Sequence, residues 1–220
     1  MKTLKMIFAA ACLIVGMNIP SAHAYVSYAS RASFDAAFPT PITENWDSYA
    51  HGTVVLNGAS LNGITYSSSS GDAVVTSADG FLTTTGAGSL GRTPFNFFGS
   101  GDSITFTFTN PLTAFGIDIN TFASGPGDYI ATLSNGDVIG SVYDPFPGYS
   151  TGEFLGFSTS AFTSLTLSTA SGYAYTLDSL RAVEGDRPSA VVPEPAPLAL
   201  FAVGLLGIIF FNFRRQLGVN

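Results

Sequence analysis

Cysteine and lysine are almost absent from this chain of 220 residues. The single cysteine, Cys12, and both lysines lie within the first 24 residues. Beyond that segment there is no thiol, which excludes disulfide bonds and a cysteine nucleophile. Stability there must come from an ordinary hydrophobic core, and about 165 residues are enough to build one.

Positive charge is also scarce between residues 25 and 195. This segment holds all fifteen acidic residues of the chain but only four basic ones, a net charge of −11; the four are Arg31, Arg92, Arg181 and Arg187. Nucleic-acid binding needs cations that neutralise phosphates, so nucleic acid is excluded as a partner. We also expect repulsion from anionic lipid surfaces.

No stretch of ten residues in the same segment shows helical periodicity. Ser33–Phe38 alone could form one or two helical turns. Alternation typical of strands is strongest in Ser103–Asn110, which Asn110-Pro111 should end. In Phe115–Ile119 the apolar residues face one way while Gly116 and Asp118 face the other. We expect these two strands to pair with each other.

Turn signals organise the remaining strands. Asn135-Gly136 separates two strand patterns and predicts a hairpin with a type I′ turn. Phe162–Ser168 and Tyr173–Val183 predict a second pair. Weaker strand patterns are Thr53–Leu56, Gly63–Ser67, Ala73–Thr76 and Phe81–Thr85. Nine to eleven short strands predict an all-β fold, a single jelly-roll-like β-sandwich.

The two ends of the chain carry targeting patterns. Lys2 and Lys5 precede an apolar run, and Ala22-His23-Ala24 predicts signal-peptide cleavage after Ala24. Near the other end, residues 196–213 hold no charge and make a helix of roughly 27 Å, close to the ~30 Å bilayer core. Arg214 and Arg215 stop this predicted helix on the cytoplasmic side.

The predicted order is a signal peptide (1–24), a β-sandwich ectodomain (25–183), a linker (184–192), a Pro-Glu-Pro motif (193–195), a transmembrane helix (196–213) and a basic tail (214–220). The combination of Pro193-Glu194-Pro195, an apolar helix and a short basic end resembles the PEP-CTERM sorting signal. This resemblance implies removal of the tail near the motif by exosortase, in a bacterium with a Gram-negative-type envelope. The ectodomain is more loosely similar to jelly rolls of the carbohydrate-binding-module type.

Two short motifs suggest enzyme chemistry but lack its context. Gly86–Gly91 spells G-x-G-x-x-G without a strand before it and a helix after it, so it predicts a flexible loop rather than a dinucleotide site. Gly148–Gly152 spells G-x-S-x-G, but His51, the one histidine after the cleavage site, precedes the serine. That order differs from the usual one of such hydrolases.

Acidic residues from the first and last segments of the ectodomain are candidate calcium ligands. Glu44, Asp47 and Asp178 offer the hard oxygen atoms that Ca²⁺ prefers, and the jelly-roll resemblance implies that such an ion is common in this fold. The alternative is that these carboxylates cap turns.

An aromatic loop offers a candidate glycan surface. Tyr143, Phe146 and Tyr149 lie within seven residues that prolines stiffen, and flat rings stack on sugars. The alternative is that Phe146 and one tyrosine fold inward as a lid on the sandwich.

The sequence therefore predicts an exported, non-enzymatic protein of the cell surface or extracellular matrix. Its expected partners are the secretion translocon, the inner membrane during transit, and exosortase. Two other functions stay open: a carbohydrate-binding module for exopolysaccharide, and a secreted hydrolase.

Overall fold

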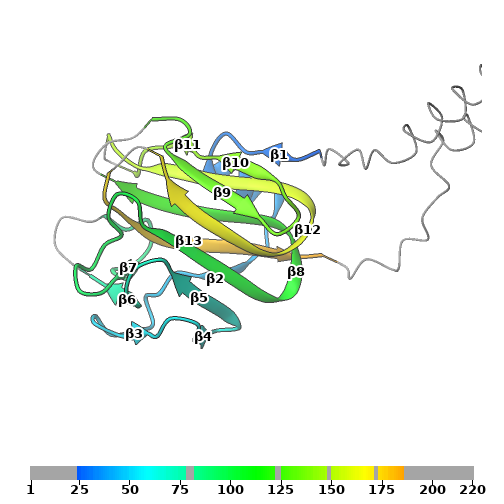
Figure 1. Cartoon of the computed structure of the whole chain (residues 1–220). Coiled ribbons are helices and arrows are strands. Elements are labelled where there is room, and N and C mark those ends of the chain that lie inside the picture. The colour runs from blue at the N-terminus through cyan, green and yellow to red at the C-terminus, as the bar shows by residue number, and fades with distance from the viewer. Residues whose placement is uncertain (1–23, 78–81, 122–124, 148–149, 171–172, 186–220) are drawn as a thin grey trace, which may run out of the picture. The chain divides into compact units, whose positions relative to one another are not determined.

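A computed structural model describes residues 24–77, 82–121, 125–147, 150–170 and 173–185 of the chain (Figure 1). These residues are mostly β, with one short helix and thirteen strands in one antiparallel sheet, so the predicted all-β class is confirmed. No helix among them is long and apolar enough to cross a bilayer. The predicted signal peptide up to His23, most of the linker, the sorting motif and the transmembrane helix lie outside the described residues.

The elements are β1 (Val26–Ser27), α2 (Arg31–Ala37), β2 (Ile42–Glu44), β3 (Val54–Val55), β4 (Ser60–Leu61), β5 (Ile64–Ser68), β6 (Ala73–Thr76), β7 (Ser89–Arg92), β8 (Ser103–Thr121), β9 (Tyr129–Leu133), β10 (Val138–Gly140), β11 (Val142–Tyr143), β12 (Glu153–Thr169) and β13 (Tyr175–Glu184). The predicted short helix is α2. Ser30 caps it through a reciprocal pair of bonds with Ser33.

The two longest strands, β8 and β12, run through both layers of the fold (Figure 1). The first half of β8 pairs with β5 and the second half of β12, whereas its second half pairs with β13 and the first half of β12. Tyr129 of β9 packs edge-on against Tyr175 of β13, with the ring centroids 5.0 Å apart, although these two strands do not pair. One continuous sheet therefore bends until its halves face each other around a shared core.

The expected pairing of Ser103–Asn110 with Phe115–Ile119 is wrong, because both segments belong to β8. Pro111 has no N–H to donate and lies where the register between β8 and β12 shifts. At such a bulge a strand tolerates proline and bends instead of ending. The bend carries β8 from one layer to the other.

The expected pairing of β12 with β13 is also wrong. Ser168 of β12 pairs with Ser103 of β8, while Thr176 of β13 pairs with Asn120 of β8. Because β8 lies between them, the connection from β12 to β13 skips one strand, as in a Greek key.

The hairpin of β9 and β10 is confirmed, but its type I′ turn is not. Only Gly136 of the turn has a positive φ, 94°, and its N–H donates to the Leu133 carbonyl at 3.0 Å. Asn135 instead accepts the Asp137 N–H at 3.0 Å through its side chain. The loop therefore has three residues with glycine in the left-handed position, the second commonest hairpin class.

The predicted strand Phe81–Thr85 is not formed in its described part, residues 82–85, and the neighbouring glycine motif contains a strand instead of a flexible loop. Strand β7 pairs with β6 and, at Leu90, with β13. Leu90 is fully buried. Its position between two strands outweighs the low strand propensity of the surrounding glycines.

Candidate functional site

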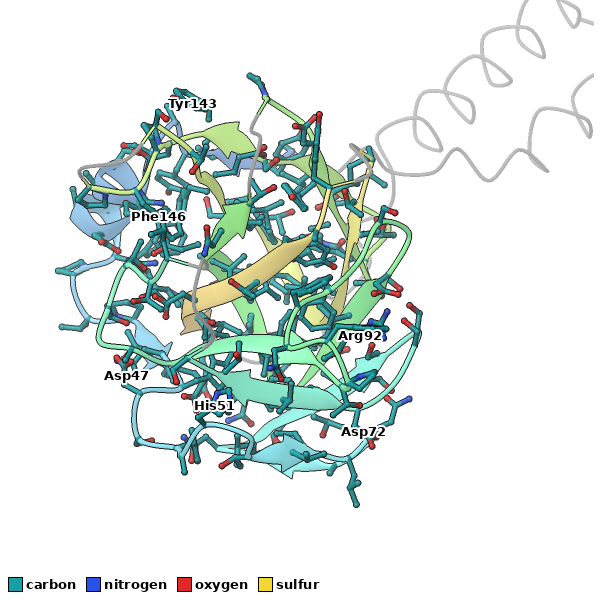
Figure 2. All side chains as sticks on the ribbon, turned by 90° about the vertical axis from the view of Figure 1, so that its left-hand side faces the viewer. Asp47, His51, Asp72, Arg92, Tyr143 and Phe146 are labelled. Atoms are coloured by element: carbon teal, nitrogen blue, oxygen red, sulfur yellow. The ribbon has the colours of Figure 1, made fainter. Side chains whose placement is uncertain are left out.

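The aromatic loop does not form a platform of three exposed rings. Phe146 is 1% exposed and packs against the Arg31 guanidinium, whose carbon lies 5.1 Å from the ring centre. Tyr143 is 46% exposed, and Tyr149 lies outside the described residues. Figure 2 shows Tyr143 at the periphery and Phe146 nearer the body of the domain. A buried ring cannot stack on a sugar, so Phe146 acts as the lid of the alternative interpretation.

Arg31, the first residue of α2, joins three elements beneath that loop. Its Nε donates to Asp118 of β8 at 2.8 Å, and its Nη1 lies 3.1 Å from the Asp144 carboxylate. Its other side-chain bonds go to the carbonyl oxygens of Asp144 and Pro145. The side chain is only 14% exposed. Such a buried guanidinium fixes the helix and the loop to the sheet, because both its charge and its donors are used inside the protein.

Two buried carboxyl groups face each other across β8 and β13. Asp118 and Asp178 are cross-strand partners, and both are fully buried. The Thr84 hydroxyl lies within hydrogen-bond reach of both. Since a hydroxyl carries one proton, it donates to only one of them at a time.

Backbone groups and, at 3.4 Å, the Thr85 hydroxyl supply the remaining donors to Asp178. The N–H groups of Thr84, Thr85 and Ser179 donate to it at 2.6, 3.0 and 2.6 Å. Burial nevertheless raises the pKa of Asp178 to about 6, because desolvation of the charged form outweighs these bonds.

A third buried carboxyl, Glu153, lies at the start of β12. It accepts hydrogen bonds from the Ser141 hydroxyl and, at 3.0 Å, from the Gly125 N–H. Burial raises its pKa to about 7. Like Asp118 and Asp178, it has no exposed surface, so no substrate can contact these three groups without a rearrangement of the fold.

The three candidate calcium ligands each have separate partners. Glu44 accepts the Trp46 N–H at 2.9 Å and the Asn62 side-chain amide at 2.6 Å. Asp47 accepts the N–H groups of Ala87 and Gly88, and Asp178 is bonded as described above. Among the residues that the structure describes, no group of three or more His, Cys, Asp or Glu is placed to hold a metal ion. The structure therefore supports the turn-capping alternative.

Two glycines of the motif Gly86–Gly91 allow the backbone to approach Asp47 and Trp46 closely. A Cβ at Gly86 would lie 2.1 Å from the Asp47 carboxylate, and one at Gly88 would lie 2.6 Å from the Trp46 carbonyl oxygen. Both glycines therefore permit close packing around Asp47. The G-x-S-x-G segment is described only from Ser150 on, so its role stays untested. Trp46 is fully buried and belongs to the main hydrophobic core.

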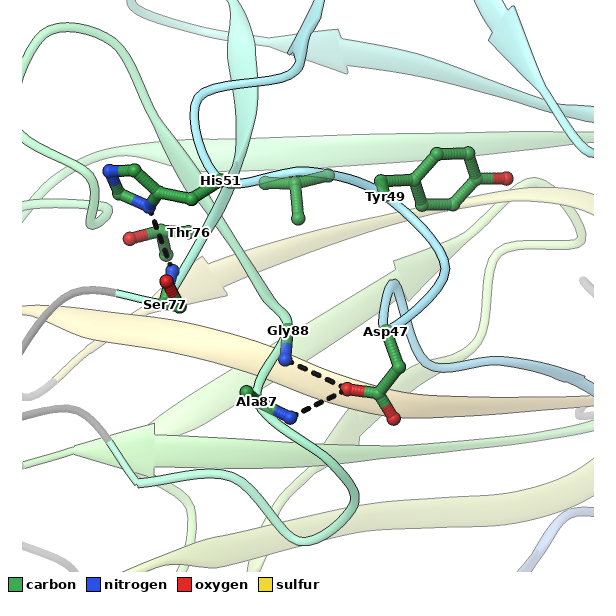
Figure 3. Close-up of a pocket in the computed structure, with 8 residues that line it drawn as sticks. Asp47, Tyr49, His51, Thr76, Ser77, Ala87 and Gly88 are labelled. Atoms are coloured by element: carbon green, nitrogen blue, oxygen red, sulfur yellow. Dashed lines mark hydrogen bonds between the residues drawn. The ribbon is translucent and has the colours of Figure 1, made fainter.

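A shallow hollow of about 140 Å³ opens beside Asp47 (Figure 3). Tyr49 and His51 come from the same stretch of backbone, and their rings point in opposite directions. The His51 Nδ1 accepts the Ser77 N–H at 3.0 Å, so this nitrogen is unprotonated and a neutral ring carries its proton on Nε2. The Oδ2 of Asp47 accepts no hydrogen bond from any described residue. The lining is completed by Val75, Thr76, Ser77, Ala87 and Gly88.

A second hollow of about 140 Å³ is lined by Thr43, Asn45, Thr85, Ser179 and Arg181. Ser179 has a φ of +46°, which is strained for this residue type, and lies where the β13 register shifts. Arg181 binds Asp35 at 2.8 Å and the Ser179 carbonyl at 2.8 Å, while its Nη2 donates to none of the described residues. Neither hollow was predicted from the sequence. The one available signal was the run of polar and aromatic side chains at alternate positions from 43 to 51.

Comparison with known proteins identifies the C-terminal segment. Residues 191–216 match the PEP-CTERM protein-sorting motif, which confirms the resemblance predicted from Pro193-Glu194-Pro195, the apolar run and the two arginines. The motif implies exosortase processing, and proteins that carry it are exported and sorted to the cell surface.

No curated protein matches the chain. Among solved structures, it is similar to the catalytic domain of a GH87 alpha-1,3-glucanase in complex with tetrasaccharides, at 16% identity and a TM-score of 0.32. The match covers 66% of this chain and 31% of that one. A likeness this distant carries no argument about fold or function.

Proposed function

We propose that this chain is a non-enzymatic protein of the bacterial cell surface or extracellular matrix, delivered there by exosortase. The observation that carries the proposal is the sorting motif at residues 191–216, which begins a few residues after β13 ends at Glu184. A short segment between a folded domain and the motif would let a membrane protease reach Pro193-Glu194-Pro195 without unfolding the sheet. Transit would involve the translocon and, briefly, the inner membrane.

The carboxyl groups in the interior of the domain are not placed to act on a substrate. Asp118, Asp178 and Glu153 are the carboxyl groups in the most unusual environments, and all three are closed to solvent. General acid–base catalysis needs groups within hydrogen-bond reach of a substrate. A secreted hydrolase would have to use other residues, and the described hydrogen bonds of His51 link it to the backbone of Ser77 rather than to a serine hydroxyl.

The test is intact-mass analysis of the protein from its native host, beside a strain in which Pro193-Glu194-Pro195 is replaced by three alanines. We expect the wild-type chain to lose residues 1–24 and everything beyond the motif, and the variant to keep its C-terminus. A chain that ends at Asn220 in both strains would overturn the proposal and leave a single-pass membrane protein. Hydrolysis of a polysaccharide by the purified wild-type chain would contradict the non-enzymatic part.

A further inference from the structure

The chain contains three Asn-Gly pairs, at residues 57–58, 62–63 and 135–136, and the structure describes all of them. Asparagine before glycine is the pair most open to deamidation, because glycine has no Cβ to keep its backbone nitrogen away from the asparagine side chain. The dipeptide alone makes the three equivalent. The structure distinguishes them by how firmly the two reacting groups, the asparagine side chain and the glycine N–H, are bonded.

The first pair is held at both reacting groups. The Asn57 side chain donates to the Ser68 carbonyl at 3.1 Å and accepts the Ser68 N–H at 2.8 Å. The Gly58 N–H donates to the Tyr66 carbonyl at 2.7 Å. Attack of this nitrogen on the side chain would break all three bonds, and each of them opposes the reaction.

The third pair is held in the same way. The Asn135 amide donates to Asp137 and Ser160, and its oxygen accepts the Asp137 N–H at 3.0 Å. The Gly136 N–H donates to the Leu133 carbonyl at 3.0 Å. The turn of the β9–β10 hairpin therefore also protects its asparagine.

The second pair, Asn62-Gly63, has the fewest bonds to break. It forms the two-residue turn between β4 and β5, where Leu61 pairs with Ile64. Both residues are exposed, with φ values of +50° and +78°, the two positive values that a type I′ turn requires. Among the described residues, the Gly63 N–H has no acceptor and the Asn62 oxygen has no donor. Only the Asn62 amide is bonded, to Glu44 at 2.6 Å.

The surroundings of this turn let it open. Strand β4 has only two residues and pairs with β5 alone. The turn also borders a third hollow, of about 160 Å³, whose lining includes Ile42 and Phe108. Short segments with few buried contacts open locally at little cost in free energy. Opening brings the Gly63 nitrogen within reach of the Asn62 Cγ and admits water.

We propose that Asn62 is a modification site at which the folded ectodomain deamidates spontaneously. The Gly63 nitrogen gives up its proton and attacks the Asn62 Cγ, the Cγ–Nδ2 bond breaks, and the departing nitrogen takes up a proton and leaves as ammonia. Water then opens the resulting cyclic imide at one of its two carbonyl carbons, which leaves aspartate or isoaspartate at position 62. The reaction needs water but no oxidant or reductant. The proposal goes beyond export and sorting, which involve neither residue.

The modification should release the turn from β2. Glu44 of β2 is 5% exposed, and the Asn62 amide is one of its hydrogen-bond donors. A carboxylate at position 62 offers no donor and repels the Glu44 carboxylate at close range. Isoaspartate also lengthens the backbone by one atom, which disturbs the pairing of Leu61 with Ile64. Because β5 stays paired with β8 from Ile64 to Ser68, the loss remains local.

The experiment incubates the full-length chain in detergent at pH 8 and follows deamidation by mass spectrometry of chymotryptic peptides. Cleavage after leucine and tyrosine places the three asparagines in separate peptides. We expect Asn62 to react about tenfold faster than Asn57 or Asn135, which corresponds to a barrier about 1.4 kcal/mol lower. Asn62→Gln should remove the early mass gain, because glutamine must close a larger ring, whereas Asn57→Gln should leave it unchanged.

The matched control is the same incubation in urea, where unfolding removes the bonds that distinguish the three pairs and their rates should become similar. Three results would each overturn the proposal: no deamidation of Asn62 in the folded chain, a rate at Asn57 or Asn135 that equals or exceeds it, or the same preference for Asn62 in urea.

A second measurement tests the consequence for β2. Asn62→Asp reproduces one product of the reaction, and amide hydrogen exchange of residues 60–64 should be severalfold faster in this variant than in the wild-type chain. Unchanged exchange would refute the role assigned to the contact between Asn62 and Glu44. None of these results bears on exosortase processing.

Discussion

The two halves of β8 are the same strand in two different environments. From Ser103 to Thr109, buried side chains alternate with half-exposed or exposed ones, whereas every residue from Ala114 to Thr121 is buried. The first half therefore has one face in water. The second half is covered on both faces, because α2 and its Phe34 pack over Ala114 and Phe154. The difference shows that the polar residues of the covered half need partners inside the protein.

Arg31 is the ion-pair partner of Asp118 in the covered half of β8, and its removal should give the largest loss of stability. Arg31→Ala leaves the buried Asp118 carboxylate with the Thr84 hydroxyl and the more distant Arg181, so we expect the free energy of unfolding to fall by about 3–5 kcal/mol. Urea unfolding followed by fluorescence of Trp46, the single tryptophan, measures it. Asp35→Ala removes a 48%-exposed ion-pair partner from the same helix and should cost less than about 1 kcal/mol. Equal losses in the two variants would refute this account.

Acidification should stabilise the domain through two buried carboxyl groups, Glu153 and Asp178, on the strands that pair with the covered half of β8. The pKa values of Glu153 and Asp178 are raised to about 7 and about 6, so both are protonated in the folded state at pH 5. As pH rises through these values, the folded state must ionise buried groups that are already ionised in the unfolded chain. We expect the free energy of unfolding to fall by about 4 kcal/mol between pH 5 and 8.

Urea unfolding at a series of pH values measures this dependence. In Glu153→Gln, the free energy of unfolding should no longer change with pH near pH 7. Glu184→Gln is the control, because Glu184 is exposed at the end of β13. A wild-type chain that loses stability as pH is lowered from 8 to 5 would show that these two groups do not control the pH dependence.

The half-exposed part of the sheet should tolerate loss of a polar contact. The hydroxyl groups of Thr105 and Thr166 are 2.8 Å apart across β8 and β12. Thr166→Val keeps the branched shape that favours a strand, so we expect a change within about 1 kcal/mol. A loss above 2 kcal/mol in urea unfolding would remove the contrast between the two halves.

Alternation in the sequence predicted which residues share a face but not what covers that face. It placed Gly116 and Asp118 opposite Phe115, as observed. It did not indicate how closely their face is covered: a Cβ at Gly116 would lie only 3.0 Å from the Phe154 ring. The covering residues come from α2, which holds Phe34, and from Phe154 at the start of β12, and no local pattern links them to β8.

Pairing across the sheet was equally beyond local patterns. Sequence neighbours such as β9 and β10 paired as expected, because a short turn leaves few alternatives. The partners of β13 were missed, since they depend on β8 passing between the layers at Pro111. The hollow that Asn45, Thr85 and Ser179 line was not predicted for the same reason, because these residues meet only after the sheet bends.

The first two strands of the domain, β1 and β2, can pair only late in folding. Val26 pairs with Ser158, and Glu44 pairs with Leu180, so the first two strands have partners that lie near the end of the domain. A chain exported from its N-terminus must therefore carry β1 and β2 unpaired until β12 and β13 emerge. Since long-range pairing is slow, the exported chain stays open, and available to chaperones and proteases, until the segment beside the sorting motif has crossed the membrane.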